Sequence, residues 1–227
     1  MKSIQKNIPC LLFFLFVLFV FDAARAQRFR AGFAAGPVIA EINGARARVC
    51  LNKLGFTLGG IVNSALNEKN TLQLEINYIQ KGTLQRPDSN NNGHFKISLD
   101  YIEIPLLLKH RTHFSIAKKT VDKFDLEIGA SFGRLVRVKE LLDNSPLSSS
   151  PKFNKTDVSV FAGLDYNIVP SVYLCLRYSN SVIPVLNKSF LPAYLFRYSY
   201  NKGNNMVFQF AFKFVFGKTD EKAEATE

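Results

Sequence analysis

The sequence predicts an all-β fold, an eight-stranded antiparallel up-and-down transmembrane β-barrel. Three observations predict it: a secretory signal at the N-terminus, eight segments of alternating polarity after it, and a final segment, 206–216, with Met or Phe at every second position. A period of two places these large side chains on one face of a strand. In a membrane barrel such a face contacts lipid and needs no further layer of protein to cover it.

The first 26 residues are expected to be a signal peptide. Lys2 and Lys6 give a positive start, an apolar run covers 11–21, and Ala24 and Ala26 are the small residues of a cleavage site. The apolar run is much shorter than the about 20 residues that a spanning helix needs. Sec-type export followed by cleavage is therefore expected, and a retained helical anchor is the less favoured alternative.

The exported chain is expected to hold a barrel domain over 27–217 and a polar, disordered tail over 218–227. With 29 Lys and Arg against 18 Asp and Glu, the full chain carries a formal net charge of +11. Such an excess favours anionic surfaces, which for an exported protein are lipopolysaccharide phosphates, anionic lipids or acidic glycans. Nucleic acid is not an expected partner, because no motif combines aromatic and basic residues for it.

Eight segments are expected to be strands because apolar and polar residues alternate along them. They cover 28–41, 54–66, 71–81, 95–109, 123–136, 156–168, 171–183 and 206–216. The first alternates Phe29 and Phe33 with smaller or basic residues. The second contains Gly55 and Gly59, and glycine permits the bends and close packing of a tightly curved barrel wall.

The third and fourth segments show how the two faces differ. The third places Leu74 on one face and Glu75 on the other. In the fourth, the apolar residues occupy odd positions over 95–99 and even positions over 102–108. A β-bulge near Tyr101 is expected to cause this switch.

The last four segments repeat the pattern of one apolar and one mixed face. The mixed faces carry Glu127, Asp165, Arg177 and Lys213. An even strand count agrees with bacterial single-chain barrels. Each segment is therefore consistent with a wall that is apolar toward lipid and polar toward the interior.

The links between segments alternate in length. Long links follow the first, third, fifth and seventh segments, at 42–53, 82–94, 137–155 and 184–204, and tight ones lie at 67–70 and 169–170. Membrane barrels have long loops outside and short turns in the periplasm, so both termini are expected in the periplasm. The link at 110–122 departs from this rule. It is expected to be a loop on the periplasmic side, but it is longer than the short turns expected there.

Six charged residues are expected to form a polar network in the barrel interior: Glu75, Glu103, Glu127, Asp165, Arg177 and Lys213. An eight-stranded barrel is just wide enough for side chains to fill it. Unpaired buried charges cost several kcal/mol each, so these residues are expected to pair as a plug. A narrow ion or water path is the alternative.

Nine basic residues of the predicted outer loops are candidates for binding an anionic surface. They are Arg46, Arg48, Lys53, Arg86, Lys139, Lys152, Lys188, Arg197 and Lys202. Arg forks and Lys point charges suit the phosphates of lipopolysaccharide. Ordinary packing against that leaflet is the simpler interpretation, and specific capture of a ligand is the hypothesis.

Neither catalysis nor metal binding is expected. His94 lies near Ser89 and Asp88 in a predicted outer loop, but the signal for a hydrolase is weak. His110 and His113 supply two metal ligands without a third. No catalytic residue, no metal and no cofactor are therefore predicted.

Two cysteines, Cys50 and Cys175, remain after removal of the signal. A disulfide between them is one alternative in an oxidising compartment. The favoured interpretation of Cys175 is a small side chain that fills space in mid-strand.

A soluble, secreted lipocalin-like barrel that binds a small apolar ligand is the main competing fold. Its strands also alternate, but its apolar face points inward and its polar face points out. The alternate faces here are rich in Gly, Ser and Asn as well as charged residues, which favours the membrane barrel.

Three stretches resemble the PorT-like family of outer-membrane β-barrels of the Bacteroidota: Leu74–Gly82, Tyr101–Lys109 and the closing Phe-rich segment, 206–216. The most specific is Tyr101–Lys109, with the pattern Tyr-x-Glu-Ile-Pro-Leu-Leu-x-Lys. The resemblance implies an eight-stranded outer-membrane barrel but no single activity. The founding member acts in protein secretion and gliding, and nothing in this chain assigns it that role.

The sequence thus predicts a non-enzymatic protein of the outer membrane with a structural or binding role at the cell envelope. Lipopolysaccharide, outer-membrane lipid and an envelope or secretion protein are the expected partners. The barrel is expected to be monomeric.

Overall fold

A computed structural model describes residues 29–42, 53–85, 94–116, 119–142, 145–146, 153–185 and 203–216. The expected signal peptide, 1–26, and the expected tail, 218–227, lie outside these residues. No helix in these ranges is long and apolar enough to cross a membrane.

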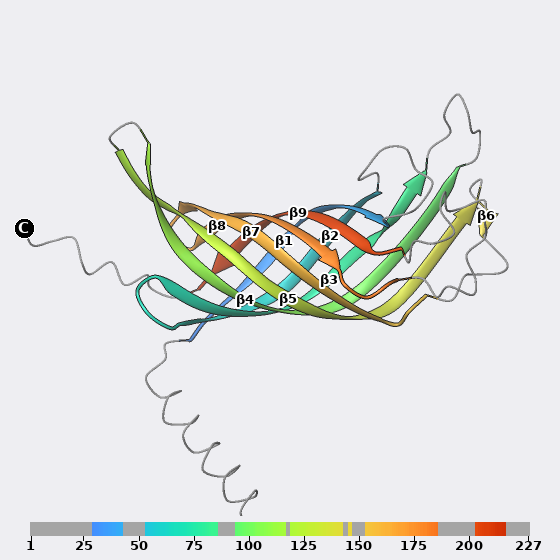
Figure 1. Ribbon diagram of the computed structural model, residues 1–227, viewed down its shortest axis with the longest axis horizontal. Helices are drawn as coiled ribbons and strands as arrows, with labels where there is room; N and C mark the ends of the chain where they lie inside the picture. The colour runs from blue at the N-terminus through green and yellow to red at the C-terminus, as the bar shows by residue number, and fades with distance from the viewer. Residues whose placement is uncertain are drawn as a thin grey trace, which may run out of the picture.

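The described chain is built from antiparallel strands (Figure 1). They are β1 (Phe29–Ile42), β2 (Lys53–Ala65), β3 (Asn70–Gln85), β4 (Phe95–Ile116), β5 (Lys119–Leu142), β6 (Ser145–Pro146), β7 (Thr156–Val169), β8 (Val172–Ser181) and β9 (Asn205–Val215). Their order is β4-β3-β2-β1-β9-β8-β7-β5, and β4 pairs with β5 to close the ring. The two-residue β6 pairs only with the end of β5, at Leu141 and Leu142. The predicted eight-stranded antiparallel barrel is confirmed.

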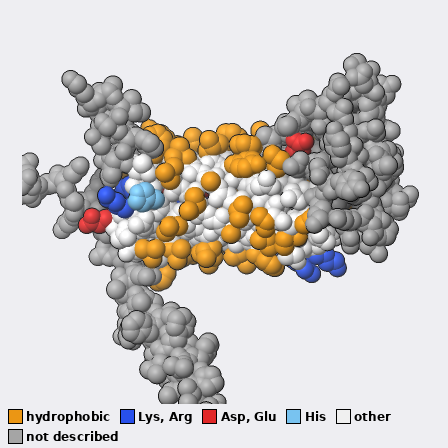
Figure 2. Space-filling model, viewed as in Figure 1, with side chains coloured by type: hydrophobic (Ala, Val, Ile, Leu, Met, Phe, Trp, Pro, Cys, Tyr) orange, Lys and Arg blue, Asp and Glu red, His pale blue; other side chains and the backbone are white. Residues whose placement is uncertain are grey.

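The apolar face of each strand points away from the interior. In β9, Phe210 and Phe212 are exposed, whereas Val207, Ala211 and Lys213 are buried. Figure 2 shows the result as a band of hydrophobic side chains across the middle of the visible face of the barrel. The lipocalin-like alternative is therefore wrong, because it requires this apolar face to point inward.

The long and short connections lie at opposite ends of the barrel. We call the end with the long connections the outer end. At the other end, the inner end, lie the turns β2–β3, β4–β5 and β7–β8 and both ends of the described wall, Phe29 and Phe216 (Figure 1). In the β2–β3 turn, the Asn67 side-chain oxygen accepts hydrogen bonds from the backbone N–H groups of Lys69 and Asn70.

The expected loop at 110–122 is instead a continuation of two strands. β4 runs to Ile116 and β5 starts at Lys119, so only 117–118 separate them. The pairing of β4 with β3 ends at His110, and the hairpin extends beyond it (Figure 1). The segment is rich in polar and basic residues and lacks a continuous apolar face, which is why the sequence pattern indicated a loop.

An irregularity does occur next to Tyr101, as expected, but it does not switch the faces of β4. The apolar residues at odd positions over 95–99 point inward, and so does Tyr101, so β4 keeps one orientation throughout. The irregularity lies in its partner: the register with β5 shifts between Asp100 and Tyr101 and skips Val136. The sequence pattern changes because the outer part of the interior is apolar, not because the strand turns over.

The apolar core fills the outer part of the interior. Its buried members are Val38, Ala40, Ile42, Ile79, Phe95, Ile97, Leu99, Tyr101, Val185 and Val207. Leu135 and Phe153 pack against it. The interior therefore has a mainly apolar section toward the outer end, where Glu41, Lys53 and Glu140 are also buried, and a section rich in ion pairs next to it.

Candidate functional site

The charged section of the interior contains every residue predicted to line it. Glu75, Glu103, Glu127, Asp165, Arg177 and Lys213 are all buried. Each occupies a strand position whose neighbours along the chain point outward, as the period of two requires. The structure divides these six residues between two separate clusters.

Arg177 of β8 is at the centre of the first cluster. Its Nε donates a hydrogen bond to Oε1 of Glu127 at 2.6 Å. Its Nη1 and Nη2 donate to the two carboxylate oxygens of Glu75 at 3.0 and 2.8 Å. β8 and β3 stand four places apart in a ring of eight strands, so the Arg177–Glu75 pair crosses the lumen. The guanidinium also lies 4.5 Å from the centre of the Phe161 ring.

Lys213 of β9 connects the cluster to a further carboxylate. Its Nζ lies 2.7 Å from Oε2 of Glu127 and 2.9 Å from Oδ1 of Asp165. Lys109 of β4 also reaches Asp165, at 2.7 Å. Three cations, Lys109, Arg177 and Lys213, thus balance the three carboxylates of Glu75, Glu127 and Asp165. Sequence reasoning missed Lys109, although it shares the inward face of β4 with Glu103.

Glu103 belongs to the second cluster. Lys81 of β3 pairs with Glu103 and, at 2.9 Å, with Asp157 of β7. Asn205 of β9 donates a hydrogen bond to Asp157 at 3.1 Å, and Nζ of Lys81 lies 5.4 Å from the centre of the Tyr101 ring. Lys81 and Asp157 were also missed, and strand alternation alone would have placed both inside.

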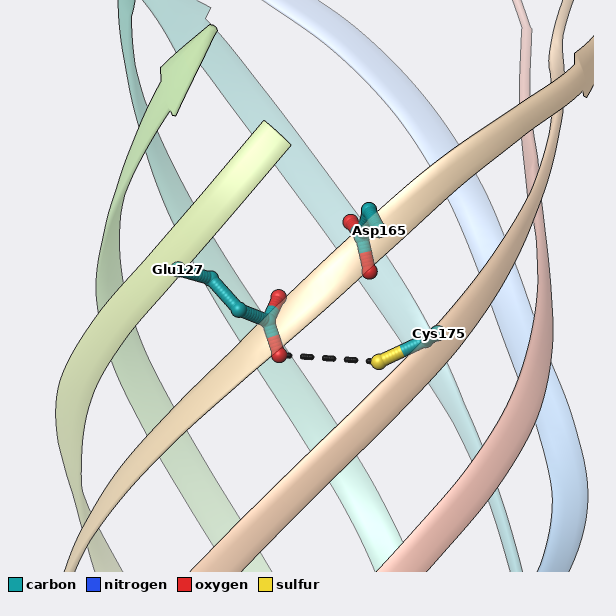
Figure 3. Close-up of side chains that lie close together, drawn as sticks. All are labelled: Glu127, Asp165 and Cys175. Atoms are coloured by element: carbon teal, nitrogen blue, oxygen red, sulfur yellow. Dashed lines mark hydrogen bonds between the residues drawn. The ribbon is translucent and has the colours of Figure 1, made fainter. Parts of the chain in front are cut away.

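Glu127, Asp165 and Cys175 point toward one another in the first cluster (Figure 3). Their potential ligand atoms lie within 4.8 Å, which is a geometry that could hold a metal ion. The ammonium of Lys213 already contacts both carboxylates, so a protein cation supplies the charge that a metal would bring. The arrangement fits an ion-pair network better than a metal centre.

Cys175 is a free, buried thiol whose Sγ donates a weak hydrogen bond to Glu127 at 3.5 Å. It therefore packs inside the charged cluster, in agreement with the space-filling interpretation. The other member of the alternative disulfide, Cys50, lies outside the described residues.

The histidines give no assembled site in the described chain. His110 is exposed, and its Nδ1 lies 2.8 Å from the side-chain oxygen of Asn70. The side chain of His113 falls outside the description, as do Ser89 and Asp88, the expected neighbours of His94.

The nine basic candidates of the outer loops are only partly covered by the structure. Seven lie outside the described residues: Arg46, Arg48, Arg86, Lys152, Lys188, Arg197 and Lys202. Lys139 is exposed, but it belongs to β5, which extends to Leu142. For Lys53 the expectation is wrong: it is the first residue of β2 and only 2% exposed. It shares the inward face with Thr57, so it cannot meet an external surface.

Sequence reasoning also missed three outward-facing cations on β4 and β5, of which two are exposed and Lys96 is half-buried. Only Arg137 lies in the segment 137–155 that was treated as a loop. Arg134 and Arg137 lie on β5 and Lys96 lies on β4. Arg137 is held by Asp100, with 2.5 Å between Nε and Oδ2. Their outward position places them beside Lys139 at the outer end.

Solved structures with a similar fold are outer-membrane proteins of low sequence identity. Ail, the attachment invasion locus protein of Yersinia pestis, solved with the heparin analogue sucrose octasulfate, is 13% identical at a TM-score of 0.47, over 83% of this chain and 99% of that one. Neisserial surface protein A is 15% identical at 0.44, over 83% and 97%. OprG of Pseudomonas aeruginosa is 14% identical at 0.34, over 84% and 95%.

No curated protein matches the chain. Residues 23–187 match the family described as the outer membrane protein beta-barrel domain. This match covers most of the chain and includes strands β1 to β8. The lipid-type outer face, the closed ring and this match agree, and the chain therefore belongs to the outer membrane protein beta-barrel domain family.

Proposed function

We propose that this protein is a non-enzymatic, non-conducting barrel with a structural or binding role at the outer surface of the outer membrane. The observation that carries the proposal is the ion-pair bridge from Arg177 across the lumen to Glu75, with Glu127 beside it. Because side chains close the interior, the exposed rim is the part of the barrel that remains available for interaction.

The energetics of the interior argue against the alternative of a narrow ion path. The barrel is of the size that side chains alone can fill. A permeating ion would have to separate pairs such as Lys213–Asp165, and each buried charge left unpaired costs several kcal/mol. The apolar core adds a second section of packed side chains on the outer side of this barrier.

The binding role proposed for the rim follows from charge and position. The net charge of +11 favours anionic partners. At the outer end of an outer-membrane barrel the nearest such partner is lipopolysaccharide, and an envelope or secretion protein is the second candidate. The signal peptide at 1–26 is proposed to deliver the chain there.

The finer assignment to the PorT-like family of the Bacteroidota is also part of this proposal. Its support is the stretch Tyr101–Lys109, in which Tyr101, Glu103 and Lys109 all point inward. Glu103 and Lys109 form ion pairs in the two clusters, and the Tyr101 ring contacts Lys81. This stretch would then be a signature of the plug rather than of a catalytic site.

Single-channel recording of the full chain in a planar lipid bilayer tests the closed barrel. We expect no steady conductance from the native protein and transient steps from Arg177→Ala, which removes the bridge. Lys69→Gln, which changes an exposed cation at the inner end, is the control and should stay silent. Steady conductance from the native protein would contradict the proposal.

Binding to lipopolysaccharide tests the proposed role of the rim. The seven cations of the outer loops, Arg46, Arg48, Arg86, Lys152, Lys188, Arg197 and Lys202, are replaced together by Gln, and retention on immobilised lipopolysaccharide is measured. Weaker retention is expected. Unchanged retention would exclude the loops as the binding element.

A further inference from the structure

We propose that the outward face of β4 and β5 at the outer end holds a specific site for a phosphorylated lipid of the outer leaflet. The site, which we name the rim patch, consists of Lys96, Asp100, Arg134, Arg137 and Lys139. It rests on the proposed function in one respect, that the outer end faces the outer leaflet. Unlike the loop residues, it is carried by paired strands.

The strand register places these residues on one face. Directly opposed residues of antiparallel strands share a face. Asp100 opposes Arg137, and the next outward pair joins Ser98 to Lys139. Arg134 opposes Ile102, which is exposed on the apolar belt. The skipped residue, Val136, is what brings Arg137 and Lys139 onto the same face as Arg134.

Arg137 is positioned before any ligand arrives. Its Nε donates to Asp100 at 2.5 Å, and its Nη2 lies 3.4 Å from the hydroxyl of Tyr78. That hydroxyl donates to the same Asp100 oxygen at 2.7 Å and accepts from Gln80 at 3.2 Å. The Asp100 carboxylate is buried, whereas the Arg137 side chain is 66% exposed. A fixed, exposed guanidinium loses less conformational entropy when it binds an anion.

The charges of the rim patch are unbalanced. Lys96, Arg134, Arg137 and Lys139 are four cations, and Asp100 is the one carboxylate among the patch residues. Asp100 is occupied with Arg137 and Tyr78, so the patch keeps an excess of positive charge toward solvent. Phosphate groups, which accept several charge-assisted hydrogen bonds, match such a surface.

The neighbouring apolar belt identifies the ligand as a lipid. Directly toward the membrane from Arg134 and Asp100 lie Phe132, Ile102 and Ile104, which are all exposed. Figure 2 shows basic side chains at the border of the hydrophobic belt at this end. A phosphorylated acyl lipid fits both features at once, whereas free phosphate uses only the cations.

The test uses the full chain in nanodiscs of neutral phosphatidylcholine. Binding is measured for diphosphorylated lipid A, for lipid A with its phosphates removed, and for inorganic phosphate. We expect preferential binding of the diphosphorylated form. Arg137→Gln should weaken it about tenfold, as expected for the loss of one charge-assisted contact. Lys69→Gln, which removes the same charge at the inner end, should leave affinity unchanged.

Asp100→Asn separates positioning from net charge. It makes the patch more positive, so a purely electrostatic surface would bind the lipid more tightly. If Asp100 positions Arg137, binding weakens instead. Recovery of a boiling-dependent gel shift in each variant shows that the barrel is still folded.

Several outcomes would overturn the rim patch. Two concern the variants: native lipid affinity in the double variant Arg134→Gln/Arg137→Gln, or equal losses of affinity from Arg137→Gln and Lys69→Gln. Two concern the ligands: equal affinity for lipid A without its phosphates, or complete displacement of lipid A by inorganic phosphate at the same concentration. If the loop variant loses lipopolysaccharide while the rim variants keep it, the proposed function stands and the rim patch fails.

Discussion

At the scale of single residues, the interior depends on pairing rather than on burial alone. Arg177 contacts two carboxylates at once, and both lie on strands other than its own. Removing one partner of a buried ion pair leaves an uncompensated charge, which costs far more than a broken surface pair. The contribution of Arg177 should therefore exceed that of any exposed cation.

Arg177→Met is expected to lower the free energy of unfolding by about 3–5 kcal/mol, because Glu75 loses its strongest partner and remains buried. Urea unfolding of the full chain in detergent, followed by gel mobility without boiling, measures it. The double variant Glu75→Gln/Arg177→Met should recover part of the loss, since it removes the orphaned charge. If the loss of unfolding free energy in the double variant equals the sum of the losses in Glu75→Gln and Arg177→Met, the two residues of the cross-lumen pair are not coupled.

Strand alternation predicted that the six charged residues of the network face inward, but not which of them pair. It indicated the six interior charges by their position opposite the lipid face. Pairing depends on how the strands are staggered around the ring, and a period of two does not encode that stagger. Glu103 was therefore grouped with Glu75, although Lys81 pairs with it in another cluster, which also contains Asp157. The prediction for Lys53 was wrong for a related reason. β2 begins one residue earlier than expected, and that residue is Lys53, which therefore faces the interior instead of lying in a loop.

At the scale of elements, close packing at a glycine shapes β2. A Cβ on Gly59 would lie 1.9 Å from the side-chain oxygen of Asn77 and 2.3 Å from the backbone oxygen of Ile76. A Cβ on the adjacent Gly60 would meet only a methyl group of Ile76, at 3.8 Å. Two neighbouring glycines thus have opposite requirements, since one faces the interior and the other faces out.

Gly59→Ala should destabilise the barrel by about 1–3 kcal/mol through overpacking, whereas Gly60→Ala should change its stability little. Urea midpoints of the two variants give the comparison directly. Both substitutions reduce the flexibility of the backbone alike. Equal changes in stability would therefore mean that this flexibility decides the result, and not the lack of space for a side chain on the inner face.

The strands were largely predictable because each is long and regularly alternating, as in β3 and β9. The two element-level errors both lie in β4 and β5. The hairpin beyond His110 has no lipid-facing pattern, so nothing in the sequence distinguished a projecting ribbon from a loop. The skipped Val136 changes the face of Arg137 and Lys139 through pairing with a second strand, which a single segment cannot reveal.

The hairpin of β4 and β5 should be dispensable for the barrel itself. Replacing 113–123 by Asn-Gly keeps the Thr112–Phe124 pair and supplies a favoured two-residue turn. We expect the boiling-dependent gel shift to persist and stability to change by about 1 kcal/mol or less. A chain that no longer reaches the outer membrane after this replacement would show that the hairpin serves assembly.

At the scale of the whole molecule, the two sets of charges differ in their exposure to ions. The Debye length falls from about 10 Å at 0.1 M salt to about 3 Å at 1 M, and buried pairs are screened much less than exposed ones. The Arg177 and Lys213 pairs lie inside the ring, whereas Arg137 and Lys139 lie on its outer face.

Raising NaCl from 0.1 M to 1 M should therefore leave the urea midpoint of the native barrel nearly unchanged while it weakens lipid A binding at the rim patch several-fold. The same protein in the same nanodiscs supplies both measurements, so a general effect of salt on the bilayer would appear in both. A strong fall in stability with salt would mean that water and ions reach the interior pairs. The barrel would then be open to solvent along its axis, which contradicts the cross-lumen bridge from Arg177 to Glu75 as a seal.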